Sequence, residues 1–74
     1  MTAMRATLAG RIGGTPVALE VDGGLWDRFR NLRVALGQSE EGMLRWLTCD
    51  GEVEATEERV AAFVKALEER RAYP

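Results

Sequence analysis

The sequence contains no histidine and a single cysteine, Cys49, among its 74 residues. A disulfide within one chain is therefore excluded, and so is a zinc site built on histidine or paired cysteine ligands. Histidine is also the side chain that most often acts as a general base near neutral pH. Because no other set of catalytic groups is recognisable, we expect a protein that is not an enzyme and that holds no metal and no cofactor.

Long apolar runs are missing as well. No segment approaches the roughly 20 apolar residues that a membrane-spanning helix needs. The first ten residues, MTAMRATLAG, lack the continuous apolar stretch of a secretory signal. The sequence thus predicts a reduced, cytoplasmic setting, with no membrane and no small-molecule substrate among the partners. In that setting we interpret Cys49 as a small, half-buried residue at a helix end.

What the chain has instead is a nearly balanced charge that is unevenly distributed. The 10 basic and 12 acidic residues give a net charge of −2, which argues against a protein that coats nucleic acid by bulk positive charge. Arginines cluster in the first half and carboxylates in the second. A chain of this size buries a modest fraction of its surface, and without disulfides or metal its remaining support is self-association. We therefore expect one small domain, residues 1–74, that forms a homodimer.

Two stretches near the start alternate between apolar and polar residues, RATLAGRI and TPVALEVD. They are joined by two glycines, a pattern that predicts a β-hairpin over residues 4–22. Ala18 and Glu20 are expected to face outward from the second strand. Its apolar side chains share the opposite face: Val17, Leu19 and Val21.

Three helices are predicted after the hairpin, over residues 25–36, 39–49 and 56–71. At or just before the start of each lies a residue whose side chain can accept hydrogen bonds from the first turn of a helix: Asp22, Ser39 and Thr56. Apolar residues recur at helical spacing in each segment, and Phe29 is central in the first stripe. The order β-β-α-α-α predicts an α+β fold.

The segment from Val17 to Leu47 resembles the ribbon–helix–helix family. VALEVD matches the ribbon, LWDRFRNLRVALG the first helix and QSEEGMLRWL the second. The resemblance implies a homodimeric DNA-binding transcriptional regulator, in which two chains pair their ribbons antiparallel above four interlocked helices. It also implies that outward ribbon side chains enter the major groove, and that Gln38 and Ser39 hold a phosphate at the start of the second helix.

The chain departs from this pattern where DNA would be contacted. Ala18 and Glu20 are not residues that read base edges well, and Glu40 and Glu41 lie where a phosphate would dock. Arginines elsewhere are then better candidates, together with Trp26, which we expect to cover the core from the side or to join a contact patch. The candidate nucleic-acid or partner contacts are Arg5, Arg11, Trp26, Arg28, Arg30, Arg33, Gln38 and Ser39.

Two other interpretations stay open. The segment LRVALGQSEEGMLRWL also resembles the opening of a helix-turn-helix domain, whose next helix would start near Glu54. Alternatively, the chain is a non-catalytic protein–protein module. A phage-encoded inhibitor or adaptor of that kind would use the acidic second half to bind a host protein, such as a nuclease, a CRISPR effector or a polymerase.

Overall fold

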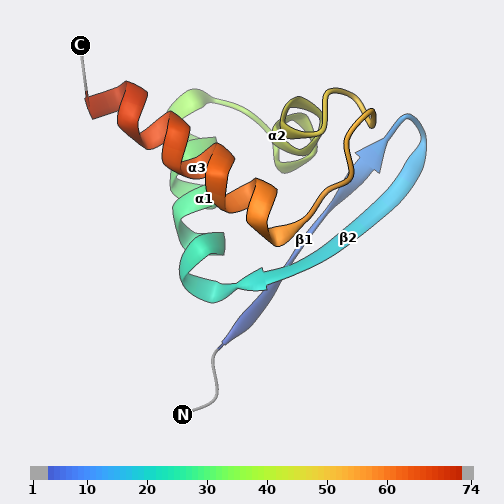
Figure 1. Cartoon of the computed structure of the whole chain (residues 1–74), viewed down its shortest axis with the longest axis horizontal. Coiled ribbons are helices and arrows are strands. Elements are labelled where there is room, and N and C mark those ends of the chain that lie inside the picture. The colour runs from blue at the N-terminus through green and yellow to red at the C-terminus, as the bar shows by residue number, and fades with distance from the viewer. Residues whose placement is uncertain (1–3, 73–74) are drawn as a thin grey trace.

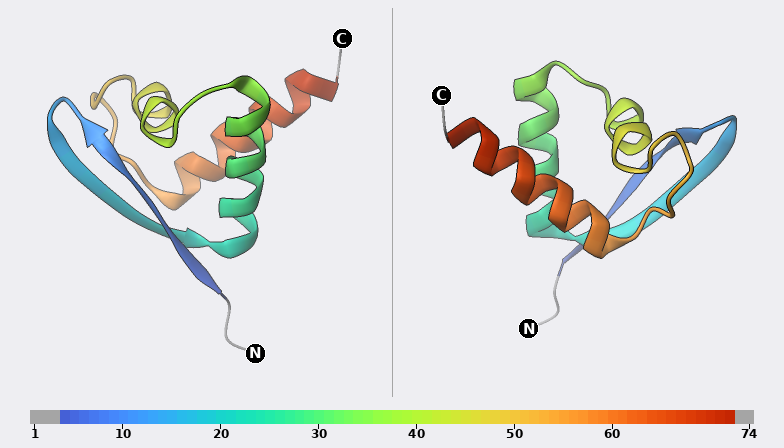
Figure 2. Two further views of the ribbon diagram at one scale, coloured as in Figure 1. Left: turned by 180° about the vertical axis from the view of Figure 1, so that it is seen from behind. Right: turned by 45° about the horizontal axis from the view of Figure 1, so that its top comes forward.

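The computed structural model describes residues 4–72, which form a β-hairpin followed by three helices (Figure 1). The predicted α+β fold and its element order are confirmed. The helices gather on one side of the hairpin, and the molecule measures 35 × 35 × 19 Å (Figure 2). The elements are β1 (Arg5–Ile12), β2 (Thr15–Asp22), α1 (Gly23–Leu36), α2 (Glu40–Leu47) and α3 (Glu57–Ala72).

The hairpin turns at Gly13 and Gly14, whose φ angles are 58° and 82°. A two-residue turn with both residues left-handed matches the twist of the flanking strands, and glycine adopts it without steric cost. The strands are antiparallel, from Ile12 opposite Thr15 to Arg5 opposite Asp22. As predicted, one face is turned inward and the other is exposed. The buried inner residues are Leu8, Ile12 and Val21.

The α1 helix begins two residues before the predicted start. The Asp22 side chain accepts hydrogen bonds from the N–H groups of Gly24 and Leu25, at 3.0 and 3.3 Å, which supplies partners for the first turn. The helix ends at Gly37, which is left-handed with φ 67°. Of the apolar stripe predicted at Leu25, Phe29, Leu32 and Leu36, the first three are buried, whereas Leu36 at the end of the helix is exposed.

The α2 helix begins as predicted after Ser39, whose hydroxyl accepts a hydrogen bond from Gly42 N–H at 2.9 Å. It ends at Leu47, two residues earlier than predicted, because the chain turns left-handed at Cys49, Asp50 and Gly51. Cys49 is exposed, so its prediction as half-buried is wrong. The buried polar side chain here is instead Thr48, whose hydroxyl donates to the Leu44 carbonyl at 2.7 Å.

The α3 helix crosses α1 and the end of β2 and closes the core (Figures 1 and 2). Its start is capped by Thr56, which accepts a hydrogen bond from Arg59 N–H at 3.1 Å. Val60, Val64 and Leu67 are buried against the hairpin and the other helices. A homodimer of so small a chain is expected to share most of its core between the subunits, but Phe29 is 1% exposed within this single chain because α3 covers it.

The packing of α2 against β1 is unusually close at Gly10. A Cβ atom at this position would lie 3.1 Å from Cα of Glu41 and 3.2 Å from a methyl group of Leu44. Gly10 is therefore required by the approach of the helix to the strand. Within residues 4–72, no helix combines the length and the apolar composition needed to cross a membrane.

Candidate functional site

The outer face of the hairpin carries charges of both signs. Arg5, Thr7, Ala9 and Arg11 point outward from β1 and are exposed. The residues opposite them, Pro16, Ala18, Glu20 and Asp22, are exposed on β2. Ala18 and Glu20 thus face outward as predicted. Since this face carries two arginines and two carboxylates, its net charge is zero.

Arg5 is tied into the fold rather than free. Its guanidinium donates to both oxygens of Glu57, at 3.1 and 3.2 Å, and to the Glu20 carbonyl at 3.2 Å. The Asp22 N–H also donates to Glu57, at 2.7 Å. The hydrogen bonds from Arg5 and from this N–H lower the pKa of Glu57, and the same carboxylate raises the pKa of Arg5. Glu57 therefore fastens the start of α3 to the hairpin.

Arg28 is likewise paired, with Glu68 of α3. The hydrogen bond and the charge of each partner raise the pKa of Arg28 and lower that of Glu68. Both side chains are substantially exposed, so solvent screens the pair and its net contribution to stability is small. Arg28 thus joins α1 to α3, and it is a weaker candidate for partner contacts than the arginines without a carboxylate.

Trp26 and Arg30 form a patch on one side of α1. The Arg30 guanidinium carbon lies 5.7 Å from the centre of the Trp26 ring, a cation–π arrangement. Trp26 is partly buried against the core, and Arg33 continues the same side of the helix. Arg5 and Trp26 both line a 370 Å³ pocket at the start of α1. The structure thus brings Trp26 together with Arg30 and, at the pocket, with Arg5, while Arg33 lies further along the same side of α1 and Arg11 next to the turn of the hairpin.

The start of α2 is engaged with β1. Glu40 accepts a hydrogen bond from Ala9 N–H at 2.9 Å, and Glu41 accepts one from Arg11 N–H at 2.6 Å. Ser39 caps the helix, and Gln38 is exposed beside it. A phosphate at this helix end would meet the two glutamates, which repel it. Their bonds occupy two N–H groups on the outer edge of β1 and place α2 along that edge.

The outer edge of β2 is open in its middle. In an antiparallel ladder, pairs of opposite residues that bond to each other alternate with pairs whose backbone groups point away from the partner strand. The bond from Gly23 N–H to the Met4 carbonyl shows that these two residues are a bonded pair, so the next pair, Arg5 and Asp22, is non-bonded, and so is every second pair after it. Pro16, Ala18, Glu20 and Asp22 therefore point their backbone groups outward. Asp22 N–H is bonded to Glu57, the Glu20 carbonyl is bonded to Arg5, and Pro16 has no N–H.

Four outward groups of β2 consequently have no hydrogen-bond partner within residues 4–72: the N–H groups of Ala18 and Glu20 and the carbonyls of Pro16 and Ala18. A groove of 530 Å³ lies beside them. It is formed by one end of the hairpin and by the connection between α2 and α3. Its lining residues are Ile12, Thr15, Pro16, Val17, Ala18, Gly51, Val53, Glu54 and Ala55.

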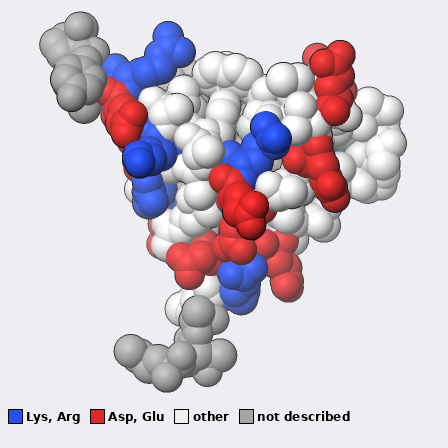
Figure 3. All heavy atoms as spheres, in the orientation of Figure 1, with Lys and Arg blue, Asp and Glu red and all other residues white. Residues whose placement is uncertain are grey.

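The surface charge is mixed. On the face shown in Figure 3, carboxylates gather along the bottom and the right-hand side, and basic groups lie mainly toward the C-terminal end of α3. Within residues 4–72, no carboxylate forms an ion pair with Arg11, Arg30 or Arg33. No group of three or more His, Cys, Asp and Glu side chains in this range could hold a metal ion.

Sequence reasoning missed the roles of Glu40, Glu41 and Glu57. Their positions in the sequence indicate only first-turn carboxylates that suit the helix dipole, and they do occupy first turns. Their bonds reach the hairpin, 30 or more residues away. No local pattern carries that information. Comparison of the chain with protein-family models, with curated proteins and with solved structures found no match.

Proposed function

We propose that this protein is a homodimeric DNA-binding regulator whose two copies join through the open edges of their β2 strands. The observation that supports the dimer is the set of unpartnered groups on that edge. The donors on this edge can bond to the acceptors on the same edge of a second copy of the chain. An unpaired strand edge is a template for association with another strand, and β2 is the more accessible side because α2 is bonded to the β1 edge through Glu40 and Glu41.

The complementarity is clearest about a two-fold axis at Ala18. Ala18 of each chain then lies opposite the partner's Ala18, and each donates its N–H to the other's carbonyl. The Glu20 N–H meets the partner's Pro16 carbonyl. The opposite pair of groups, the Pro16 nitrogen and the Glu20 carbonyl, needs no bond across the interface, since Pro16 has no N–H and the Glu20 carbonyl is bonded to Arg5. All four unpartnered groups of the β2 edge would thus be hydrogen-bonded in the dimer.

The side chains fit the same register. Val17 would lie opposite the partner's Leu19 on the inner face, where both residues are only partly buried in one chain. Their burial between two copies would contribute apolar area to the interface. On the outer face, Ala9 and Ala18 of both chains would form a row of small residues. Glu20 would neighbour the partner's Pro16, so no like charges would meet.

The proposed DNA contacts are made by Arg11, Arg30 and Arg33. These exposed or half-exposed arginines have no carboxylate partner among the described residues, so they can bind phosphates. Three per chain give six per dimer. If each neutralises one phosphate, the logarithm of the binding constant should fall with the logarithm of salt concentration with a slope of about −5. The outer face of the hairpin, being neutral, would add little.

The dimer is tested by light scattering on the purified protein and on an Ala18→Pro variant. Proline removes the central N–H of the interface, so the variant is expected to be a folded monomer. Ala18→Thr, which keeps this N–H and suits a strand, is the control and should remain a dimer. Circular dichroism verifies that both variants are folded. A strictly monomeric wild-type protein would refute the dimer.

DNA binding is tested by fluorescence anisotropy with a random duplex and with the DNA upstream of the protein's own gene. Binding is expected at low salt, and it should weaken steeply as salt rises. The Arg30→Ala/Arg33→Ala variant should bind more weakly, and because its dimer loses four of the six contacts its slope should be shallower by about 3.6 units. An absence of binding to either duplex at micromolar protein and low salt would refute this function.

A protein–protein module is the second candidate. Asp50, Glu52 and Glu54 are exposed along the connection between α2 and α3, where they form an acidic segment. Such a surface can occupy the basic groove of a nucleic-acid enzyme by charge complementarity. Co-purification from the native host would test this candidate. Recovery of a stoichiometric partner that is lost on reversal of these charges would favour it over DNA binding.

A further inference from the structure

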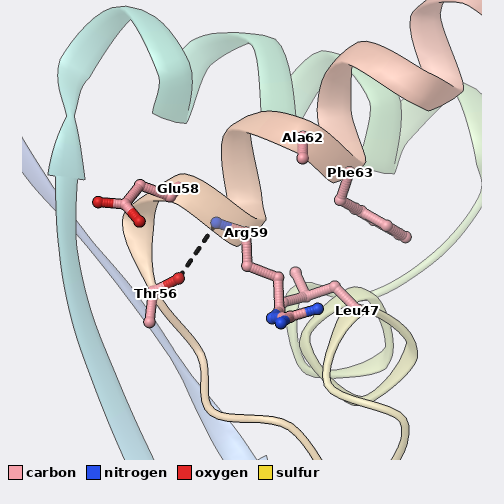
Figure 4. Close-up of a pocket in the computed structure, with 6 residues that line it drawn as sticks. All are labelled: Leu47, Thr56, Glu58, Arg59, Ala62 and Phe63. Carbon is pink, nitrogen blue, oxygen red and sulfur yellow. Dashed lines mark hydrogen bonds between the residues drawn. The ribbon is translucent and has the colours of Figure 1, made fainter.

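A second groove lies between α2 and α3, away from the β2 edge. Its volume is 470 Å³, within the range of about 300–1,000 Å³ that is typical of ligand pockets. Figure 4 shows Arg59 and Phe63 extending from α3 toward Leu47 of α2, while Glu58 is directed to the other side. The lining residues are Leu47, Thr56, Glu58, Arg59, Ala62 and Phe63.

Phe63 lines the groove and packs against Trp46, which borders the groove and lines a neighbouring pocket with Gly42, Arg45 and Asp50. Trp46 of α2 meets Phe63 edge to face, with ring centres 5.1 Å apart and an angle of 83° between the rings. Trp46 is nevertheless 50% exposed, although it is a large apolar side chain. The contact with Phe63 fixes the ring without covering it. A partner would therefore bury the remaining surface of Trp46 at little further cost in side-chain entropy, which is how tryptophan contributes to interface hot spots.

The lining carries one charge of each sign, and the positive one, Arg59, is the charge on the side of Leu47 and Phe63. Arg59 has no ion-pair partner within residues 4–72, and its side chain is held over the apolar floor. Arg45, on the same side of α2 as Trp46, is already paired with Asp50 at 2.9 Å. Glu58 is directed away, as Figure 4 shows. An occupant thus meets apolar surface with one available guanidinium beside it.

We propose that this groove binds a short acidic segment of another protein, with an apolar side chain inserted against Phe63 and Trp46 and a neighbouring carboxylate on Arg59. Nucleic acid fits less well, because a duplex needs several cations along its backbone and the groove supplies one. The site goes beyond the proposed DNA-binding function. It uses neither the β2 edge nor Arg30 and Arg33, so either proposal can fail without the other.

The probe is the peptide acetyl-Asp-Leu-Phe-Asp-amide, titrated into the full-length, isotope-labelled protein while amide resonances are followed by NMR. Saturable shifts are expected at the lining residues of the groove. A matched peptide with Asn in place of both Asp residues should bind about threefold to fivefold more weakly, the loss expected for an exposed ion pair. A peptide with Ser in place of Leu and Phe should not saturate.

Variants of the protein assign the site. Arg59→Ala should weaken the acidic peptide about threefold to fivefold and leave the Asn peptide unchanged. Trp46→Ala should weaken both peptides by more than about tenfold. Lys65→Ala, an exposed basic residue of α3 that does not line the groove, is the matched control and should change neither affinity. Amide spectra of the free variants verify that each is folded.

Three outcomes would overturn the proposal. One is equal affinity of the acidic peptide for the wild-type protein and for Arg59→Ala. Another is a set of shifts that maps to the groove beside β2 instead of the one between α2 and α3. The third is a 20-base-pair duplex that shifts the same amides at lower concentration than the peptide, which would make the groove a nucleic-acid surface.

Discussion

Replacement of Glu40 and Glu41 by alanine should both destabilise the fold and open the outer edge of β1. In the native protein these carboxylates accept hydrogen bonds from the N–H groups of Ala9 and Arg11, at 2.9 and 2.6 Å. They also lie in the first turn of α2, where negative charge is favoured by the helix dipole. Alanine removes the acceptor and the charge, whereas glutamine removes the charge and keeps an oxygen acceptor.

The magnitude follows from these two contributions. A hydrogen bond contributes about 0.5–1.5 kcal/mol to the free energy of unfolding, more when an ion is involved, but solvent screens the contacts at this exposed edge. First-turn charge adds about 0.3–1 kcal/mol for each residue. We therefore expect a loss of about 2–3 kcal/mol for Glu40→Ala/Glu41→Ala. The corresponding double glutamine variant should lose about 1 kcal/mol, because it loses charge alone.

Urea denaturation followed by circular dichroism gives the free energies, and amide hydrogen exchange locates the effect. Exchange at Ala9 and Arg11 should accelerate in the double alanine variant and change little in the double glutamine variant. The Thr7 N–H, on the same edge but without a hydrogen-bond partner within residues 4–72, is the internal control. Equal stability of the alanine and glutamine variants, or unchanged exchange at Ala9 and Arg11, would refute the reasoning.

Further perturbations test the core, the connection after α2 and the tie between α3 and the hairpin. Phe29→Ala should lower the free energy of unfolding, measured by thermal denaturation, by about 3–5 kcal/mol. Arg30→Ala, on the exposed side of the same helix, should change it by no more than about 0.5 kcal/mol. Similar losses for the two variants would mean that the buried stripe of α1 is misassigned. Gly51→Ala should lower the melting temperature, because φ is 94° and the new methyl group would lie 2.9 Å from Ile12; an unchanged melting temperature would contradict this. The pKa of Glu57 is depressed below its ordinary value of 4.5, so its contribution to stability is present above that pH and is lost as the pH falls through the depressed pKa. Urea denaturation measured from pH 7 to pH 3 should therefore show the difference in free energy of unfolding between the wild-type protein and Glu57→Gln becoming smaller as the pH falls. A difference that stays constant would argue against a stabilising contact between Glu57 and the hairpin.

The elements of this fold were predictable because their signals are local. Alternation on both sides of Gly13 and Gly14 predicts a hairpin, and the structure has one with that turn. The side chains of Asp22, Ser39 and Thr56 cap the three helices as their positions indicated. Each cap bonds to a residue two or three positions away, so the sequence pattern contains both partners.

The error at Cys49 has a local cause that the sequence did not reveal. The chain leaves α2 through three left-handed residues, two of which are not glycine, and this is an uncommon conformation for them. The turn is held by Thr48, which is buried and whose carbonyl accepts hydrogen bonds from Gly51 and Val53 at 3.1 and 3.0 Å. Cys49 is thereby turned to the surface. A helix-stop signal at Gly51 alone places the end of α2 too late.

The contacts that define the candidate surfaces could not be predicted, because they depend on how elements are placed relative to one another. Glu57 reaches Arg5 only once α3 has crossed the hairpin, and Trp46 meets Phe63 only once α2 and α3 lie side by side. Neither pair has a spacing that a sequence pattern records. Trp26, by contrast, packs against the side of the core and under Arg30, in agreement with the position expected from α1 periodicity.

The two edges of the hairpin differ in a way that limits how the protein can assemble. A two-stranded sheet with both edges open can add strands on both sides, so association has no natural end. Here Glu40 and Glu41 occupy the Ala9 and Arg11 N–H groups of β1, which places α2 along that edge, while the N–H groups of Ala18 and Glu20 stay open on β2. If α2 keeps a further strand off β1, pairing of two copies through β2 uses the accessible edge, and assembly stops at two. The double alanine variant therefore carries a second consequence: if the proposed dimer forms through β2, opening β1 should allow species larger than the dimer. Sedimentation velocity at rising concentration would detect them, and a variant that stays dimeric would show that β1 is covered by α2 itself and not by the two carboxylates.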